Sequence, residues 1–315
     1  MKSFLISIDT EGDNLWAWRK GNKITTKNAD FLERFQNLCN EFGFKPTYLT
    51  NYEMAKSQEF VKFAKKHVAS AEAEIGMHLH AWNTPPDFEL GSQNPNPGAP
   101  YLIEYPYEVM DQKILTMTAL LESTFERKIE THRAGRWATD ERYFELLHKY
   151  GYGFDCSITP HVNWSNKPGE SLNSHGSDYS KESEKAHILI GGQKPLYEIP
   201  CTVRISHRYF KPSSSSIRGF AGSIYRQITG DFIWLRPDGY NLDKMLWVID
   251  SVSEDKSADY IMFMLHSSEL MPGGSPTFRT PESIERLYQD IRIVFTEASK
   301  RFEGKTICEY GRSIL

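Results

Sequence analysis

Residues 3–13 of the chain, SFLISIDTEGD, join an apolar segment directly to a group of acidic residues. Residues 4–8 have the nearly continuous hydrophobic character of a strand in a sheet that is covered on both faces. Asp9, Glu11 and Asp13 follow at the exit of this strand. Crowded like charges repel one another, so the group indicates either a solvated turn or a site that uses a cation or transfers a proton.

The composition is that of an ordinary globular protein. The chain has 315 residues, of which 39% are hydrophobic and 25% charged, and its net charge of −4 gives no sign of nucleic-acid or anionic-membrane binding. The four cysteines are widely spaced, so we expect reduced, buried thiols. No secretory signal and no apolar run of about 20 residues is found, from which we expect a cytoplasmic protein without a membrane helix.

Predicted strands and helices alternate along the chain. After the first strand, helices are expected at 28–42, 59–67, 108–125, 140–150, 242–252 and 281–301, and strands at 46–49, 74–80, 129–133, 153–156, 187–190, 197–200 and 260–265. Asn28 and Thr139 are candidate N-caps, and Gly43 is a candidate helix end. The alternation predicts a parallel sheet with crossover helices, closed as a barrel or open. Glycine-rich nucleotide-binding motifs are absent.

Residues capable of catalysis recur at the ends of these predicted strands. In a parallel barrel the carboxyl ends of all strands open on one rim, and this rim carries the active site. The coincidence of five such strand ends is the main sequence argument for an enzyme. The residues concerned are Asp9, Glu11, His78, His80, Arg133, Asp155 and His266.

The segment His78-Leu79-His80 predicts a metal site. Residues at i and i+2 of a strand point to the same face, so both imidazoles could bind one ion. A carboxylate from the first strand, Asp9 or Glu11, would complete three ligands and leave a position open for water, as in catalytic zinc sites. The alternative is a pair of partly buried histidines bonded to backbone, but the predicted neighbouring carboxylates favour the metal.

His266 and two arginines could complete a catalytic group. Asp155 could orient His266 and hold it charged as a general acid. Arg133 or Arg136 could pair with Asp9 and keep it ionised. The alternatives are a structural histidine and an arginine in a rim salt bridge of little consequence.

Five motifs resemble, in order, those of the polysaccharide deacetylase superfamily, carbohydrate esterase family 4 and its relatives. They are IDTEG (8–12), GMHLH (76–80), HRAGRW (132–137), DCSITP (155–160) and LHSSELMPGGSP (265–276). The HxH pair with the HSSE-type last motif is most similar to the WalW-like branch, which is associated with surface-polysaccharide biosynthesis. The resemblance implies an irregular (β/α)7 TIM-like barrel.

The resemblance also implies roles for individual residues. They are Asp9 as general base, Glu11 and His78 as metal ligands, Arg133 orienting Asp9, Asp155 orienting His266, and His266 protonating the leaving amine. The family's second metal histidine follows the first by four residues, where this chain has Trp82; His80 is our inferred replacement. The adjacent aspartate pair of the first motif is also missing. The expected cofactor is a divalent metal ion, Zn²⁺.

These observations predict one catalytic domain over 1–315, with loop insertions near 83–107, 160–195 and 202–240. The expected activity is metal-dependent removal of an N-acetyl or O-acetyl group from a sugar, polysaccharide or glycan precursor. Two alternatives remain open: hydrolysis of a non-sugar amide C–N bond on the same barrel, and a degenerate barrel that binds glycan without cleaving it. A glycosidase fits poorly, since two catalytic carboxylates leave the histidines unexplained.

Overall fold

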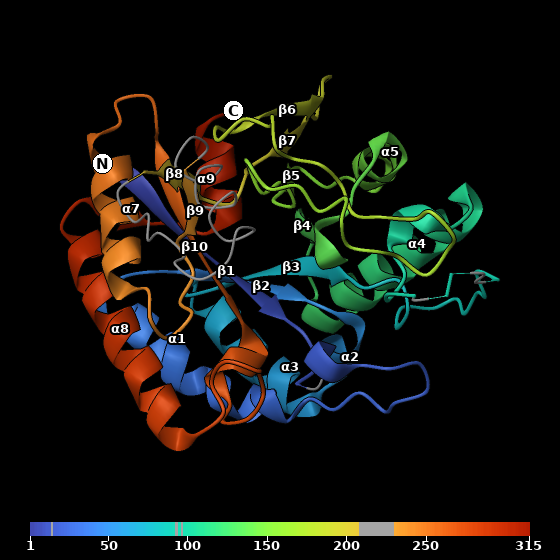
Figure 1. Cartoon of the computed structure of the whole chain (residues 1–315), viewed down its shortest axis with the longest axis horizontal. Helices are drawn as coiled ribbons and strands as arrows, with labels where there is room; N and C mark the ends of the chain where they lie inside the picture. The colour runs from blue at the N-terminus through green and yellow to red at the C-terminus, as the bar shows by residue number, and fades with distance from the viewer. Residues whose placement is uncertain (14, 92–93, 96, 208–229) are drawn as a thin grey trace, which may run out of the picture.

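The computed structural model describes residues 1–315 apart from residues 14, 92–93, 96 and 208–229 (Figure 1). The strands are β1 (Lys2–Thr10), β2 (Pro46–Thr50), β3 (Glu74–Leu79), β4 (Thr131–Ala134), β5 (Phe154–Asp155), β6 (His187–Ile190), β7 (Leu196–Glu198), β8 (Val203–Ser206), β9 (Asp231–Trp234), β10 (Tyr260–His266) and β11 (Phe302–Gly304). The helices are α1 (Leu32–Glu41), α2 (Tyr52–Ala55), α3 (Gln58–Ala69), α4 (Tyr107–Phe125), α5 (Glu141–Lys149), α7 (Leu242–Glu254), α8 (Pro281–Ser299) and α9 (Ile307–Ser313).

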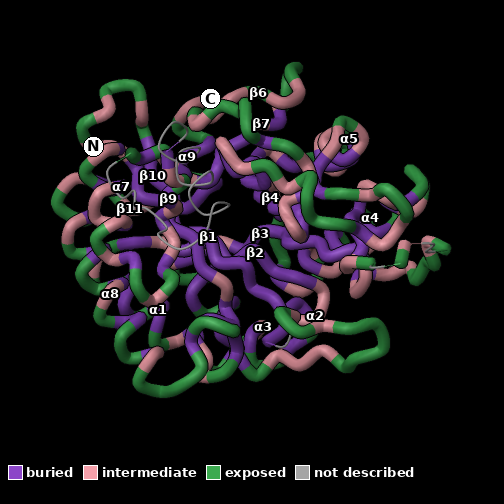
Figure 2. Tube along the Cα trace, viewed as in Figure 1, coloured by how far each residue is buried: buried purple, intermediate pink, exposed green. Residues whose placement is uncertain are grey.

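One curled sheet organises the molecule. Its strand order is β10-β1-β2-β3-β4-β5-β7-β6, and β11 also pairs with β1. Every pairing in this sheet is parallel except that of β6 with β7. Figure 1 shows α1, α7 and α8 gathered on one flank of the sheet and α4 and α5 on the other. Figure 2 shows the strands buried at the centre and the exposed surface on the outer helices and loops.

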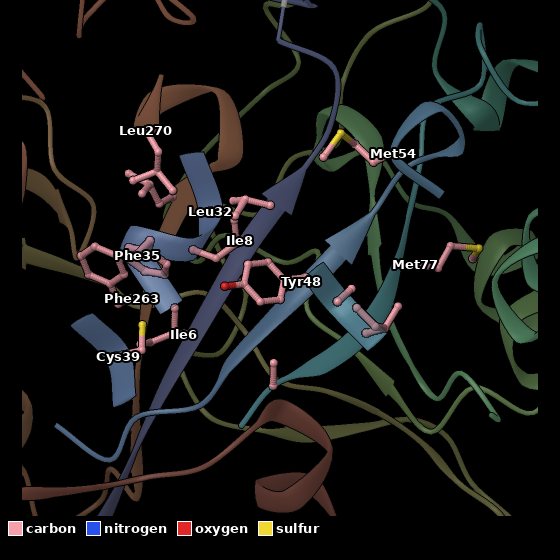
Figure 3. Packing of buried hydrophobic residues seen from close by; sticks show 14 of the residues in the cluster. Ile6, Ile8, Leu32, Phe35, Cys39, Tyr48, Met54, Met77, Phe263 and Leu270 are labelled. Atoms are coloured by element: carbon pink, nitrogen blue, oxygen red, sulfur yellow. The ribbon is translucent and has the colours of Figure 1, made fainter. Parts of the chain in front are cut away.

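The alternation of side chains along β1 separates two hydrophobic clusters. Ile6 and Ile8 point outward and pack with Phe35 of α1 in the cluster that lies beneath the helices (Figure 3). Leu5 points inward, to the cluster inside the curled sheet. Complete burial of an aliphatic or aromatic side chain of this size stabilises the fold by about 1.5–3 kcal/mol. The same alternation directs Ser7 and Asp9 inward.

A two-stranded sheet, β8–β9, lies beside β10 and continues the curl. The amide of Leu235, just after β9, donates to the carbonyl of Thr202 at 3.4 Å, and the carbonyl of Leu235 accepts from the Met264 amide of β10 at 3.1 Å. The hydroxyl of Tyr260 donates to the carbonyl of Pro200 at 2.7 Å. At the opposite end from the carboxyl ends of the strands, α9 contributes Ile307 to the inner cluster.

The irregular barrel predicted from the sequence is confirmed, with local corrections. Asn28 is not a helix cap: it lies in a 3₁₀ turn, and its side chain donates to the carbonyl of Glu11 at 2.7 Å. Thr139 does not cap α5, because the side chain of Asp140 accepts from the Tyr143 amide instead. Gly43 ends α1 with a positive φ of 68°, as expected.

The sequence patterns missed or only partly placed several segments, among them β11 and the segment 202–240. Strand β11 has only three residues, too few to show a period, and it was not predicted. The segment 202–240, whose pattern gave mixed signals, contains β8 and β9, while residues 208–229 lie outside the described residues. None of the helices in the described part of the chain combines the length and the hydrophobicity that a membrane-spanning helix requires.

Candidate metal and catalytic site

The register of the sheet directs side chains from four strands into one region. Asp9 of β1 lies opposite His266 of β10, and His78 of β3 lies opposite Arg133 of β4. Residues that are paired in a parallel ladder face the same side, so all four point to the inner face at the carboxyl ends of the strands. Glu11 extends the inward-facing series of β1 by two positions.

Asp9 and Arg133 form a buried ion pair. Nη1 of Arg133 donates to Oδ1 of Asp9 at 2.7 Å, and the arginine side chain is completely buried. The other two guanidinium nitrogens, Nε and Nη2, donate to the carbonyl of Cys156 and to the hydroxyl of Ser7, both at 2.9 Å. Burial raises the pKa of Asp9, but the charges of Arg133, His78 and His266 outweigh it, so the pKa lies below its usual value. Asp9 is therefore an ionised acceptor.

Glu11, His78 and His80 form a buried cluster that could hold a metal ion, with one ligand atom from each residue and all three atoms within 4.8 Å of one another. Nε2 of His80 lies 2.9 Å from Oε2 of Glu11 and 2.8 Å from Nε2 of His78. Burial raises the pKa of Glu11, but hydrogen bonds with both histidines bring it well below its usual value. An ionised carboxylate and two facing imidazole nitrogens are the donor set that zinc prefers.

The two histidines differ in the partners of their other ring nitrogens. Nδ1 of His78 lies 3.0 Å from the carbonyl of Arg133, a bond that fixes the ring and leaves Nε2 free to bind a metal. Nδ1 of His80 is buried and has no hydrogen-bond partner in the described part of the chain. Trp82, where the resemblance led us to look for a second metal histidine, packs edge-on against His80, with ring centroids 4.3 Å apart. The residues present therefore fit a metal, with His78 the better supported of the two histidines.

His266 faces Asp9 and Glu11 across a short gap. Its Nε2 lies 3.7 Å from Oδ2 of Asp9 and 3.9 Å from Oε1 of Glu11. Trp16 packs edge-on against the imidazole, with ring centroids 4.8 Å apart. The structure thus brings together the side chains for which the sequence predicted the roles of base, metal ligands and acid, from strands separated by more than 250 residues.

Asp155 does not belong to this group, and the predicted pairing of Asp155 with His266 is wrong. Its register partner is His132, whose Nδ1 lies 2.5 Å from Oδ1 of Asp155. Neighbouring residues of a strand point to opposite faces, so Asp155 and His132 face the outer helices when Arg133 faces inward. The carboxylate that contacts Nδ1 of His266 is Glu269, at 3.2 Å. Sequence reasoning missed Glu269, although its spacing from His266 in the HSSE segment was visible.

Replacing Asp155 by asparagine should therefore affect stability rather than chemistry. The substitution removes an acceptor that is bonded to His132 and to the amide of Ser157 at 3.1 Å. We expect the free energy of unfolding in urea to fall by about 1–3 kcal/mol, with kcat per folded molecule close to that of the wild-type protein. A variant of wild-type stability that had lost its activity would return Asp155 to the catalytic group.

Two further candidates are also placed away from the chemistry. Arg136 does not pair with Asp9: its guanidinium donates to the carbonyls of Ala99 and Pro168. It thereby links two predicted loop insertions, 83–107 and 160–195, beside the site. Asp13 accepts from the amide of Lys27 at 3.2 Å and so fixes the loop after β1 instead of entering the site.

A cleft with a volume of about 670 Å³ opens over these residues. It is lined by Asp9, Glu11, His78, His80 and His266, and by five of the seven tryptophans of the chain, Trp16, Trp18, Trp82, Trp137 and Trp164. Aromatic rings with a polar edge offer flat surfaces that suit a sugar ring. Sequence composition showed the aromatic residues, but only the folded loops gather them around one cleft.

No family model matches the chain, and no curated protein sequence matches it. Solved structures do match. A protein from Mycobacterium smegmatis assigned as a polysaccharide deacetylase is 13% identical and has a TM-score of 0.53, over 99% of this chain and 90% of that one. Puue allantoinase is 11% identical with a TM-score of 0.52, over 98% and 88%. A 4-alpha-glucanotransferase from Thermococcus litoralis is 12% identical with a TM-score of 0.55, over 98% of this chain but 40% of its own.

At these identities the likeness establishes the fold. The protein shares the fold of these structures, one of which is assigned as a polysaccharide deacetylase, and this agrees with the barrel that the order of its motifs predicted. The names of the three similar proteins describe different reactions, so an argument about chemistry has to come from the site itself.

Proposed function

We propose that the protein is a metal-dependent hydrolase that removes an acetyl group from the nitrogen, or from an oxygen, of a sugar or polysaccharide precursor. One observation carries the proposal: the ionised Asp9, held by Arg133, faces the Glu11–His78–His80 cluster and His266 within the same cleft. A base, a metal donor set and an acid in one small volume are the parts that hydrolysis of an amide or ester requires.

A divalent ion bound by Glu11, His78 and His80 would supply a polarised water and a Lewis acid for the acyl oxygen. Asp9 would take a proton from the water whose oxygen adds to the acyl carbon. Arg133 keeps Asp9 ionised and fixed in orientation. Nε2 of His266 would give a proton to the departing nitrogen or oxygen as the bond between that atom and the acyl carbon breaks. The products are acetate and the free amine or alcohol.

The tryptophan lining of the cleft supports a sugar rather than a small non-sugar amide as substrate. Stacking on rings such as Trp18 and Trp82, whose centroids are 5.4 Å apart, would hold a pyranose by its apolar face. A divalent zinc ion is the cofactor that the N, N, O donor set favours.

The proposal is tested by measuring the metal content of the purified protein and by screening for acetate release. The panel would contain soluble N-acetyl sugars, nucleotide sugars, lipid-linked precursors, O-acetyl sugars and, as the competing class, acetylated non-sugar amines. We expect a bound transition metal and release of acetate from a member of the sugar set. Release only from non-sugar amides would select the alternative hydrolase, and metal-free protein that binds glycan without turnover would select the degenerate barrel.

A further inference from the structure

The imidazole of His266 is held by the turn that directly follows it. His266 ends β10 and precedes a 3₁₀ turn, Ser267–Leu270, whose third residue is Glu269. Oε2 of Glu269 accepts from the backbone amide of His266 at 2.8 Å and lies 3.2 Å from its Nδ1. One carboxylate oxygen therefore fixes both the backbone and the ring of the same residue.

Arg236 holds Glu269 from the other side. Its Nη2 donates to Oε1 of Glu269 at 3.0 Å, and its own carbonyl accepts from the side chain of Asn241 at 2.8 Å, which fixes the segment after β9. Glu269 is buried. Burial raises its pKa, but the charge of Arg236 and the bonds with His266 bring that pKa down to about 2. Glu269 is therefore a carboxylate that can accept hydrogen bonds but cannot donate one.

Nδ1 of His266 lies close to both a donor and an acceptor, so the position of its proton decides which of the two it bonds to. Nη2 of Arg236 is 3.1 Å from Nδ1, and Oε2 of Glu269 is 3.2 Å from it. If Nδ1 carries a proton, that proton bonds to Glu269 while Arg236 donates to the other oxygen of Glu269, so every donor has an acceptor. The arrangement leaves Nε2 directed at Asp9.

We propose that Glu269, held by Arg236, is the positioning residue for His266: it accepts the Nδ1–H bond and thereby directs Nε2 into the cleft. The proposal rests on the proposed function for the role of His266 in hydrolysis. The sequence led us to expect that Asp155 orients His266, but Asp155 lies on the other face of the sheet. The chain instead builds the histidine–carboxylate pair within one turn.

The first test is spectroscopic and does not depend on turnover. In metal-loaded, ¹⁵N-histidine-labelled protein, the signals of His266 are assigned by their loss in His266→Gln. We expect a proton on Nδ1 in the wild-type protein and a changed ring signal in Glu269→Gln. A wild-type ring that carries its proton on Nε2, with Nδ1 bare beside Arg236, would overturn the proposal even if every variant failed to fold.

The second test is kinetic. We expect Glu269→Gln to lower kcat by roughly 10²-fold, the lower part of the range for a general acid, with little change in KM. Glu269→Asp retains the charge and should recover part of kcat and of the Nδ1–H signal. The matched control is Glu74→Gln, which changes a partly buried glutamate, bonded to the Cys308 amide at 3.0 Å at the far end of the barrel. Its kcat should stay at the wild-type level.

Failure of the proposed function and failure of the Glu269 proposal would give different results. Wild-type protein that binds no metal and releases no acetate contradicts the proposed function, while the position of the Nδ1 proton still tests the pairing. Wild-type protein that is active, with a folded Glu269→Gln variant of unchanged kcat, contradicts the role of Glu269 alone.

Discussion

Replacing Asp9 by asparagine should lower kcat by about 10³-fold, within the range for loss of a general base, while leaving the metal content unchanged. Asparagine keeps an oxygen that can accept from Arg133, so the buried guanidinium retains a hydrogen-bond partner. It cannot take a proton from water. The measurement is acetate release at saturating substrate, together with metal analysis of the same sample.

The substitution should also have a measurable cost in stability. Arg133 is completely buried, and removal of the charge that faces a buried ion typically costs about 3–5 kcal/mol unless other bonds compensate for it. The bonds of Arg133 to Cys156 and Ser7 provide part of that compensation. Rates should therefore be expressed per folded molecule, from the urea unfolding curve of each variant.

Asp140→Asn is the matched control. Asp140 caps α5 by accepting from the Tyr143 amide, a task that asparagine performs equally well, and it lies outside the cleft. This variant should retain wild-type kcat. Asp9→Asn protein that is folded, metal-loaded and as active as the wild-type protein would remove Asp9 from the role of base.

The second large effect is expected from the metal cluster. His78→Gln should abolish stoichiometric metal binding and acetate release together, because it removes the one histidine ligand whose ring is fixed by a bond to the Arg133 carbonyl. Dialysis of the wild-type protein against a chelator should have the same effect, and added Zn²⁺ should restore activity to the wild-type protein only. Zinc should also raise the melting temperature of the wild-type protein, since a ligand that binds only the folded state stabilises it.

His148→Gln is the control for the loss of a histidine as such. His148 lies on α5, where Nε2 contacts the carbonyl of Lys194 at 2.9 Å, outside the metal cluster. Its metal content and activity should equal those of the wild-type protein. Full activity after complete removal of metal would contradict the metal-dependent mechanism, whatever the behaviour of the variants.

Much of the fold followed from local patterns. The order of strands and helices could be predicted because hydrophobic periodicity is a property of short segments. The buried residues of α1 or β10 can be recognised from the sequence of that element alone. The pairing of His78 and His80 on one face could be predicted for the same reason, since alternation in a strand is local. Strands β11, β8 and β9 were not predicted because a period cannot be recognised in three or four residues.

The partners of the polar side chains could not be predicted in the same way. The sequence offered two arginines for Asp9 and a carboxylate, Asp155, for His266. The structure pairs Asp9 with Arg133 and directs Arg136 to loop carbonyls. It also pairs His266 with Glu269. For Arg133 and Asp155 the choice depends on which face of a strand the residue occupies, and a shift of one residue reverses that face. For Arg136 and Glu269 it depends on the 3₁₀ turn that follows the strand.

The sequence by itself determined the class of fold, the strand ends that carry reactive residues, and the common face of the two histidines. Tertiary structure alone decided which carboxylate pairs with His266, which arginine pairs with Asp9, how the tryptophans gather around one cleft, and which loops meet above it. The physical reason is the distance along the chain over which each interaction acts. Periodicity and turn chemistry act over a few neighbouring residues, whereas hydrogen bonds between side chains depend on a sheet register that joins β1 to β10 across the length of the chain.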